Sequence, residues 1–168
     1  MRLIFWLMGA TMAGVFLTML LWSGPLIMAE AGGLPLFDTR LSGYNVEEAK
    51  AFLAALSDVG RDFYLNVQHK LDSAFPALLA VVLVMAYTRV YQGWVGWIAS
   101  TLPLAAAGFD YMENAAVAVM LRAGDGLSDA MVLSASQWTE RKWIALGLAV
   151  LALFEGMVRA WRAKRKAM

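Results

Sequence analysis

Apolar residues along the chain are gathered into four long runs, separated by segments rich in glycine, proline and charged side chains. The first run, residues 3–29, has no charged side chain. A helix of that length reaches roughly 40 Å, which exceeds the ~30 Å hydrocarbon core of a bilayer. The other runs cover residues 73–92, 94–121 and 138–158. The pattern predicts an all-α fold, an integral membrane four-helix bundle that forms one transmembrane domain over residues 1–168.

The composition supports a membrane protein and excludes several kinds of site. Apolar residues make up 61% of the chain and charged residues 16%, and the mean hydropathy is +0.60. Soluble domains have about 25% charged residues. With no cysteine and with His69 as the one histidine, the chain has no disulfide, no thiolate metal site and no two-histidine zinc motif. It also lacks the basic and aromatic interleaving of nucleic-acid binders, so we expect no nucleic-acid partner.

The first apolar run has two further features. Ala29-Glu30-Ala31 resembles a signal cleavage site, but the apolar region of a signal is only about 7–15 residues long, so we expect the run to be retained as the first span. Gly9 and Ala13 are spaced four apart, and Gly14 follows Ala10 at the same spacing. Small residues at this spacing let another helix backbone approach closely. We therefore expect helix packing at Gly9, Ala13 and Gly14.

Residues 30–72 are predicted to form an external segment with an amphipathic helix between the first two spans. The part up to Asn45 has three glycines, a proline and mixed charges, which predicts an irregular loop. Asn45 is a typical helix cap, and the helix after it is expected to be interrupted near Gly60. Pro76 is expected to kink the second span. The short connection at Gly93 makes the second and third spans antiparallel neighbours.

Basic residues are concentrated at the C-terminus, where five of the fourteen lie in residues 159–168. Lys and Arg favour the cytoplasmic side of a membrane protein, so we expect this tail to be cytoplasmic. An even number of spans then places the N-terminus there too. The expected location is the bacterial inner membrane, crossed several times. The expected partners are the lipid bilayer and either another membrane protein or a second copy of the chain.

Ionisable groups inside the apolar runs are the main functional clue. A carboxylate near the bilayer centre costs at least about 2.5–3.5 kcal/mol, so it usually faces the bundle interior and has a partner. Asp110, Glu113 and Asn114 share one helix face, and His69 and Asp72 share a face of the neighbouring helix. We expect these faces to meet below the outer surface. The candidate pocket residues are His69, Asp72, Asp110, Tyr111, Glu113 and Asn114.

Two interpretations of this polar group are open. In the first, the pocket binds a divalent cation through Asp72, Asp110 and Glu113, relays protons, or holds a lipid head group. In the second, the same side chains bond to each other and hold the helices together without a ligand. No cofactor can be assigned from the residues. The loop around Asp38, Arg40 and Tyr44 either covers the mouth of the bundle or forms a solvated turn.

Several short motifs occur in a fixed order within about residues 37–121. They are Phe37-Asp-Thr-Arg-Leu-Ser-Gly-Tyr44, Glu47-Glu-Ala-Lys-Ala-Phe-Leu-Ala-Ala-Leu56, Gly60-Arg-Asp-Phe-Tyr64, Leu71-Asp-Ser-Ala-Phe-Pro76 and Asp110-Tyr-Met-Glu-Asn114. In these motifs the chain resembles a group of small uncharacterised bacterial polytopic membrane proteins. The resemblance implies a bacterial inner-membrane setting and no activity.

Three functions are compatible with these observations. The first is a small inner-membrane accessory or binding subunit that packs against a larger membrane complex. The second is a membrane enzyme or proton-coupled carrier that uses the carboxyl groups of Asp72, Asp110 and Glu113 for acid–base chemistry or metal binding. The third is a pigment-associated subunit with His69 as the ligand. Whether the chain is an enzyme is left open at this point.

Overall fold

The computed structural model describes residues 2–166, and every regular element in this range is helical, as the all-α prediction requires. In chain order the elements are α1 (Arg2–Thr18), the π-helical turn η1 (Met19–Ser23), α2 (Gly24–Glu30), α3 (Val46–Ala55), α4 (Asp58–Phe63), the π-helical turn η2 (Tyr64–Gln68), α5 (His69–Val90), α6 (Trp94–Ala99), α7 (Thr101–Ala123), the 3-10 turn η3 (Gly124–Gly126) and α8 (Asp129–Lys166).

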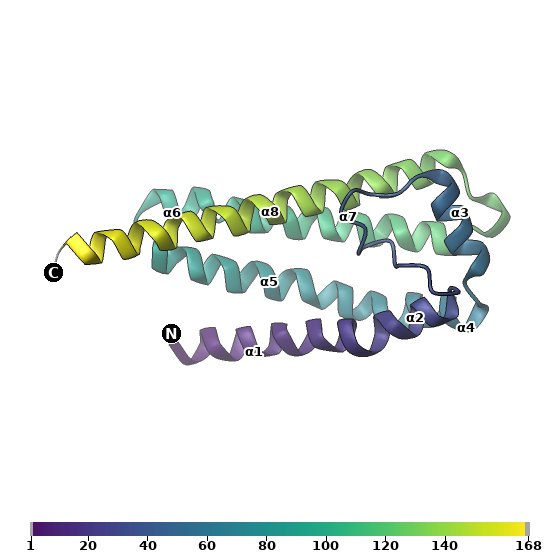
Figure 1. Cartoon of the computed structure of the whole chain (residues 1–168), viewed down its shortest axis with the longest axis horizontal. Helices are drawn as coiled ribbons and strands as arrows, with labels where there is room; N and C mark the ends of the chain where they lie inside the picture. The colour runs from purple at the N-terminus through teal and green to yellow at the C-terminus, as the bar shows by residue number, and fades with distance from the viewer. Residues whose placement is uncertain (1, 167–168) are drawn as a thin grey trace.

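The long helices lie side by side along the long axis of the molecule (Figure 1). Helix α1 packs against α5, α5 packs against α7 and α8, and α7 packs against α8. Within the described residues, three helical runs are long and apolar enough to cross a membrane: Arg2–Glu30, Asp58–Val90 and Asp129–Lys166. The predicted span 94–121 is not among them, because it is divided at Ser100 into α6 and α7 and its second part carries several polar side chains.

The external segment is built on a helix cap that the sequence predicts. The Asn45 side chain accepts a hydrogen bond from the Glu48 N–H at 2.8 Å, and the Glu48 carboxylate accepts one from the Asn45 N–H at 2.9 Å. These two bonds form a capping box, which fixes the start of α3. The buried rings of Phe37, Phe52 and Tyr64 then pack the loop and α3 onto the start of the second long helix.

The expected helix break at Gly60 is wrong. The break lies at Leu56 and Ser57, and Gly60 is inside α4, where its N–H donates to the Ser57 hydroxyl at 3.0 Å. A Cβ at Gly60 would lie 2.5 Å from the Cβ of Glu30. Gly60 is therefore required for the close approach of α2 and α4, a tertiary contact that no local pattern reveals.

The predicted fourth span and the short segment before it form one helix. Ser128 caps α8, since its hydroxyl accepts a hydrogen bond from the Met131 N–H at 3.3 Å, and the helix continues to Lys166. Helix α8 therefore extends along the whole bundle. It contacts α7, α5 and α3, so it joins the helical bundle to the segment that carries α3.

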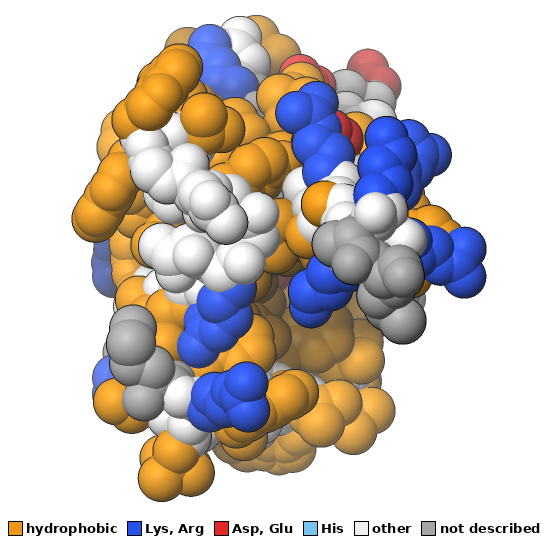
Figure 2. Space-filling view, turned by 90° about the vertical axis from the view of Figure 1, so that its left-hand side faces the viewer, with side chains coloured by type: hydrophobic (Ala, Val, Ile, Leu, Met, Phe, Trp, Pro, Cys, Tyr) orange, Lys and Arg blue, Asp and Glu red, His pale blue; other side chains and the backbone are white. Residues whose placement is uncertain are grey.

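The two ends of the molecule differ in charge. Both termini and α6 lie at one end, whereas α3, α4 and the turn before α8 lie at the other (Figure 1). Lys and Arg side chains are spread over the end that carries the termini (Figure 2). The opposite end includes the acidic first turn of α3, with Glu47 and Glu48, and also Asp125 and Asp129.

Candidate functional site

Two π-helical turns, η1 and η2, contact each other toward the end of the bundle that carries α3 and α4 (Figure 1). Such turns are rare and occur frequently at functional sites. Buried Ser23 in η1 donates a hydrogen bond to the side-chain oxygen of buried Gln68 in η2 at 2.5 Å. Gln68 Nε2 donates in turn to both carboxyl oxygens of Asp72, at 3.2 and 3.1 Å. The two turns thus start a chain of buried polar groups that ends at a carboxylate.

Pro76 determines the next connection. Because proline has no N–H, the carbonyl of Asp72, four residues earlier in α5, has no helical donor. Asn114 Nδ2 on α7 donates to this carbonyl at 3.1 Å and to Asp110 Oδ1 at 3.2 Å. Asn114 is 6% exposed, so both bonds are shielded from solvent. Helix α5 is continuous through Pro76, and the carbonyl left without a donor is used to join two helices.

Glu113 faces α8 rather than α5. Its carboxylate forms an ion pair with Lys142 and accepts a hydrogen bond from the Thr139 hydroxyl. Glu113 and Thr139 are fully buried, and Lys142 is 6% exposed. Lys142 Nζ also donates to the backbone carbonyl of Asp38 at 3.2 Å. One ammonium group therefore joins α7, α8 and the loop between α2 and α3.

That loop folds over the bundle and is fixed to α8. Trp143 Nε1 donates to the Asp38 carbonyl at 3.1 Å, and the Tyr44 N–H donates to the Ser136 hydroxyl at 2.8 Å. Asp38 Oδ1 is shielded from solvent and has no hydrogen-bond partner among residues 2–166. Burial raises the pKa of the Asp38 carboxyl above its ordinary value of 3.8, and the positive charge of Lys142 opposes this rise. The loop forms a cover over the bundle, as one of the two sequence interpretations supposes.

A cavity of about 230 Å³ lies beneath this cover. For comparison, a cavity of about 150 Å³ is large enough for benzene. One part of the wall is polar and consists of Asp38, Thr39, Gln68, Asp72, Asp110 and Lys142. The other part is apolar and includes Phe16, Met19, Leu20, Pro25, Met28, Leu36, Phe75, Leu79 and Leu146.

The apolar part of the cavity reaches the outside of the molecule at the first long helix. Phe16 and Leu20 line the cavity and are nevertheless 45% and 54% exposed. They lie within Arg2–Glu30, one of the helical runs able to cross a membrane. The opening is therefore rimmed by apolar side chains of a candidate membrane span.

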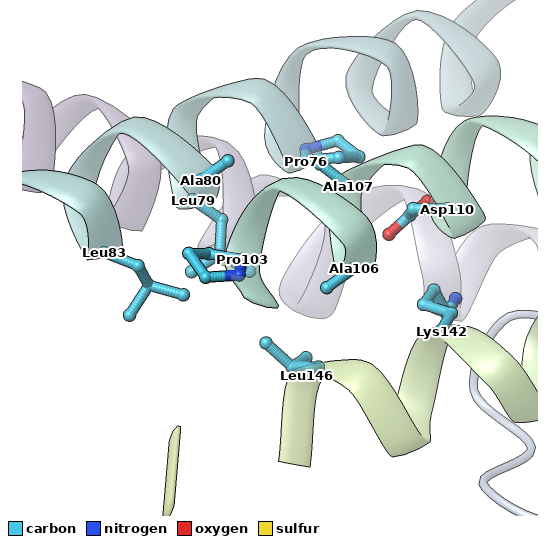
Figure 3. A pocket seen from close by; sticks show the side chains of 10 residues that line it. All are labelled: Pro76, Leu79, Ala80, Leu83, Pro103, Ala106, Ala107, Asp110, Lys142 and Leu146. Atoms are coloured by element: carbon cyan, nitrogen blue, oxygen red, sulfur yellow. The ribbon is translucent and has the colours of Figure 1, made fainter. Parts of the chain in front are cut away.

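A smaller void of about 10 Å³ adjoins the cavity between α5, α7 and α8. The two share Leu79, Asp110, Lys142 and Leu146. In Figure 3, Asp110 and Lys142 lie at one end of this void and Leu83 lies at the other. Its volume is close to the minimum for one water molecule. Polar groups of the cavity thus border a second, mostly apolar space inside the bundle.

The charges around the cavity do not balance. Asp38, Asp72 and Asp110 line it, and Glu113 lies next to it, against the single ammonium of Lys142. The charge of Lys142 acts on Glu113, Asp38 and Asp110 together. An uncompensated charge is expensive in a medium of low dielectric constant. The site therefore favours a proton or a cation over an anion.

The structure brings some of the predicted site residues together and separates others. Asp72, Asp110 and Asn114 meet between α5 and α7 as expected. Tyr111 is 41% exposed and donates from its hydroxyl to the Ser73 carbonyl at 2.9 Å, away from the cavity wall. His69 does not line the cavity, and its buried Nδ1 has no hydrogen-bond partner within the described part of the chain.

The metal interpretation has no geometric support. Residues 2–166 contain no group of three or more His, Asp or Glu residues arranged to hold a metal ion. Glu113 diverges from Asp72 and Asp110 toward α8, where the Lys142 ammonium already supplies a positive charge.

The sequence interpretation missed Asp38 and Lys142 as site residues, and it missed Ser23, Gln68 and Thr139 altogether. Lys142 carried a signal, because it is a charged residue inside the apolar run 138–158 and so needs an acidic partner. Gln68 and Ser23 carried none, because their inward orientation depends on the two π-helical turns.

Comparison with known proteins finds no match. No family model matches the chain, no curated protein matches it, and no solved structure matches it. The resemblance in short motifs stays a prediction. Function is therefore argued from the cavity and its charges.

Proposed function

We propose that this chain is a small binding protein of the membrane that takes up an amphipathic molecule from the bilayer. The observation that carries the proposal is the cavity of about 230 Å³, whose largely apolar wall also contains several polar side chains. Ligand sites typically combine a largely apolar lining with a few converging polar groups. The head group would meet the polar wall, and the chain would leave past Phe16 and Leu20.

The proposed membrane arrangement follows from the two ends of the molecule. Helix α7 would cross the bilayer with the three apolar runs, its polar side chains shielded by α5 and α8. The basic end with both termini would be cytoplasmic. The opposite end, with α3 and the cover over the cavity, would face outward. The location we propose is the bacterial inner membrane.

This topology can be tested directly because the chain has no cysteine to give background labelling. Asp125 lies in the turn before α8 and Lys164 lies near the end of α8, and each is replaced by cysteine in a separate variant. In intact cells with a permeabilised outer membrane, a membrane-impermeant maleimide should label Asp125→Cys. It should label Lys164→Cys only after the inner membrane is opened. The reverse pattern would overturn the orientation.

The binding proposal is tested with a photoreactive single-chain amphiphile in nanodiscs of phosphatidylcholine. Leu146 lines the cavity, so Leu146→Trp should fill part of it and reduce saturable labelling severalfold. Leu148 lies on the same helix and is 50% exposed, so Leu148→Trp is the matched control and should leave labelling unchanged. Labelling that does not saturate, or that is equal in both variants, would contradict the proposal.

An association with another membrane protein or a second copy of the chain is a separate proposal for the outer face of the first helix. Among the long helices α1 packs mainly against α5, and apart from the neighbouring backbone of α1 itself no atom of the described residues lies within 4 Å of a Cβ built on Gly9 or Gly14. The close packing expected at Gly9, Ala13 and Gly14 is therefore not made within the chain at the two glycines. Gly9→Leu and Gly14→Leu should abolish any oligomer or co-purifying partner, and an unchanged assembly would refute the role of this face.

A further inference from the structure

Most hydrogen-bond donors of the cavity wall are already bonded within the protein, whereas some acceptors are not. This difference limits which head group can bind. The donors are engaged within the protein: Gln68 Nε2 bonds Asp72, Trp143 Nε1 bonds the Asp38 carbonyl, and the Thr39 hydroxyl bonds the Leu36 carbonyl. Lys142 Nζ uses two of its three N–H donors, on Glu113 and the Asp38 carbonyl. A ligand that needs donors from the protein would have to break these bonds or rely on the remaining N–H of Lys142.

Acceptors, in contrast, are left over. Asp38 Oδ1 is buried, accepts no hydrogen bond within residues 2–166, and belongs to a residue of the cavity wall. Asp110 also lines the wall and has one donor, Asn114, on its Oδ1. A buried acceptor without a donor is unfavourable, and a ligand that donates there removes that cost.

The charges around the cavity also favour a ligand that donates hydrogen bonds over one that carries a negative charge. Three carboxyl groups line the cavity, those of Asp38, Asp72 and Asp110, and the one ammonium of the wall is already paired with Glu113. A phosphate or carboxylate head group would add a negative charge to this set. An ammonium head group would instead bring the opposite charge to these carboxyl groups and donate to their free oxygens, as charge-assisted hydrogen bonds require.

We infer that the amphipathic ligand of this cavity has a cationic head group with N–H donors, such as a primary ammonium, which Asp38 and Asp110 bind. This inference rests on the proposed function. The cavity size is consistent with it, because a volume of about 230 Å³ holds a small head group and a few methylene groups, and the rest of the chain lies in the bilayer beside Phe16 and Leu20.

The test is competition against a photoreactive dodecylamine in phosphatidylcholine nanodiscs. Dodecylamine should displace the probe at a concentration at least about tenfold lower than dodecanoic acid, because only the amine donates hydrogen bonds and carries the complementary charge. Dodecyltrimethylammonium carries the charge without N–H donors and should lie between the two. Equal or better displacement by dodecanoic acid would overturn the inference.

Variants assign the effect to the cavity. Asp38→Asn and Asp110→Asn should each weaken dodecylamine binding about tenfold, since each replaces a charged acceptor by a neutral one. Asp125→Asn removes the same charge at an exposed turn and is the matched control, which should bind as the wild type does. If Asp38→Asn and Asp125→Asn behave alike, the inference is wrong.

The outcomes separate this inference from the proposed function. Labelling that Leu146→Trp abolishes, but that dodecanoic acid and dodecylamine compete equally, would leave the cavity as a binding site and reject the cationic head group. Absence of saturable labelling with amines and acids alike would reject both.

Discussion

The buried pair of Glu113 and Lys142 gives the sharpest test of how the bundle is held together. Replacing Lys142 by Met leaves the Glu113 carboxylate fully buried with the Thr139 hydroxyl as its remaining bond. Because neither side chain is more than 8% exposed, solvent does not screen the loss. Removal of one partner of such a pair costs about 3–5 kcal/mol. We expect Lys142→Met to lower the free energy of unfolding by that amount.

Replacing the acidic partner of the pair should lower the free energy of unfolding by less. In Glu113→Gln, Lys142 keeps its bond to the Asp38 carbonyl and the attraction of Asp38 and Asp110. The double variant buries no unpaired charge at this position. It should therefore lose less free energy of unfolding than the two single variants lose together. We expect a coupling energy of about 2 kcal/mol or more, near the upper part of the usual range for residues in contact.

The assay is reversible unfolding by sodium dodecyl sulfate in mixed micelles, followed by far-ultraviolet circular dichroism. The control is the exposed pair of Lys50 and Asp129, whose side chains are 52% and 65% exposed. Lys50→Met should change the free energy of unfolding by about 1 kcal/mol or less. A Lys142→Met loss no larger than that of Lys50→Met, or a coupling energy near zero, would refute the argument that this pair joins α7 and α8.

Three further predictions address other parts of the fold. Asn114→Val should lower the free energy of unfolding by about 1–3 kcal/mol, and by less in a Pro76→Ala background, where the restored N–H satisfies the carbonyl; an equal loss in both backgrounds would contradict this. Because the pKa of the Asp38 carboxyl is raised, the folded protein stays protonated at Asp38 up to a higher pH than the unfolded chain does. The free energy of unfolding should therefore fall as the pH rises from 3.8 through the raised pKa. Asp38→Asn should remove this decline when unfolding is measured over a series of pH values. Gly156→Ala places a Cβ 2.5 Å from a Val90 methyl group and should lower stability, whereas Gly147→Ala meets no atom within 4 Å and should not, as thermal unfolding would show.

Local signals predicted the starts of helices well. Asn45 lies where its side-chain oxygen can accept from the N–H three residues later, a preference that depends only on the neighbouring sequence. The prediction at Gly60 failed because that glycine serves a contact with Glu30 in another helix. A glycine required by tertiary packing and a glycine that ends a helix look the same in a sequence.

The burial of acidic groups could also be predicted, but their partners could not. The cost of placing a carboxylate in lipid requires Glu113 to face inward, and it is fully buried. Spacing alone places Glu113 on the same face as Asp110 and Asn114, which suggests one shared partner. In the structure, Asn114 bonds a carbonyl of α5 and Glu113 pairs with Lys142 of α8, because the face is wide enough for two neighbours.

The irregular parts of the backbone explain why a cavity exists where a packed core is expected. Irregular backbone at membrane depth is tolerated where it is buried in protein or lines a cavity. Here the two π-helical turns contact each other and are joined by the bond between Ser23 and Gln68, and Asn114 bonds the carbonyl that Pro76 leaves without a donor.

Filling the space with larger apolar side chains would remove both the void and the need for these partners. A space of about 230 Å³ also gives up the packing contacts that larger apolar side chains would make. The chain instead keeps the space and lines part of it with Asp38, Asp72 and Asp110. Helix packing alone needs no space for a further molecule, whereas binding does. If Leu146→Trp fills the cavity and raises stability while it abolishes labelling, the cost of the empty space and its use for binding are demonstrated by the same substitution.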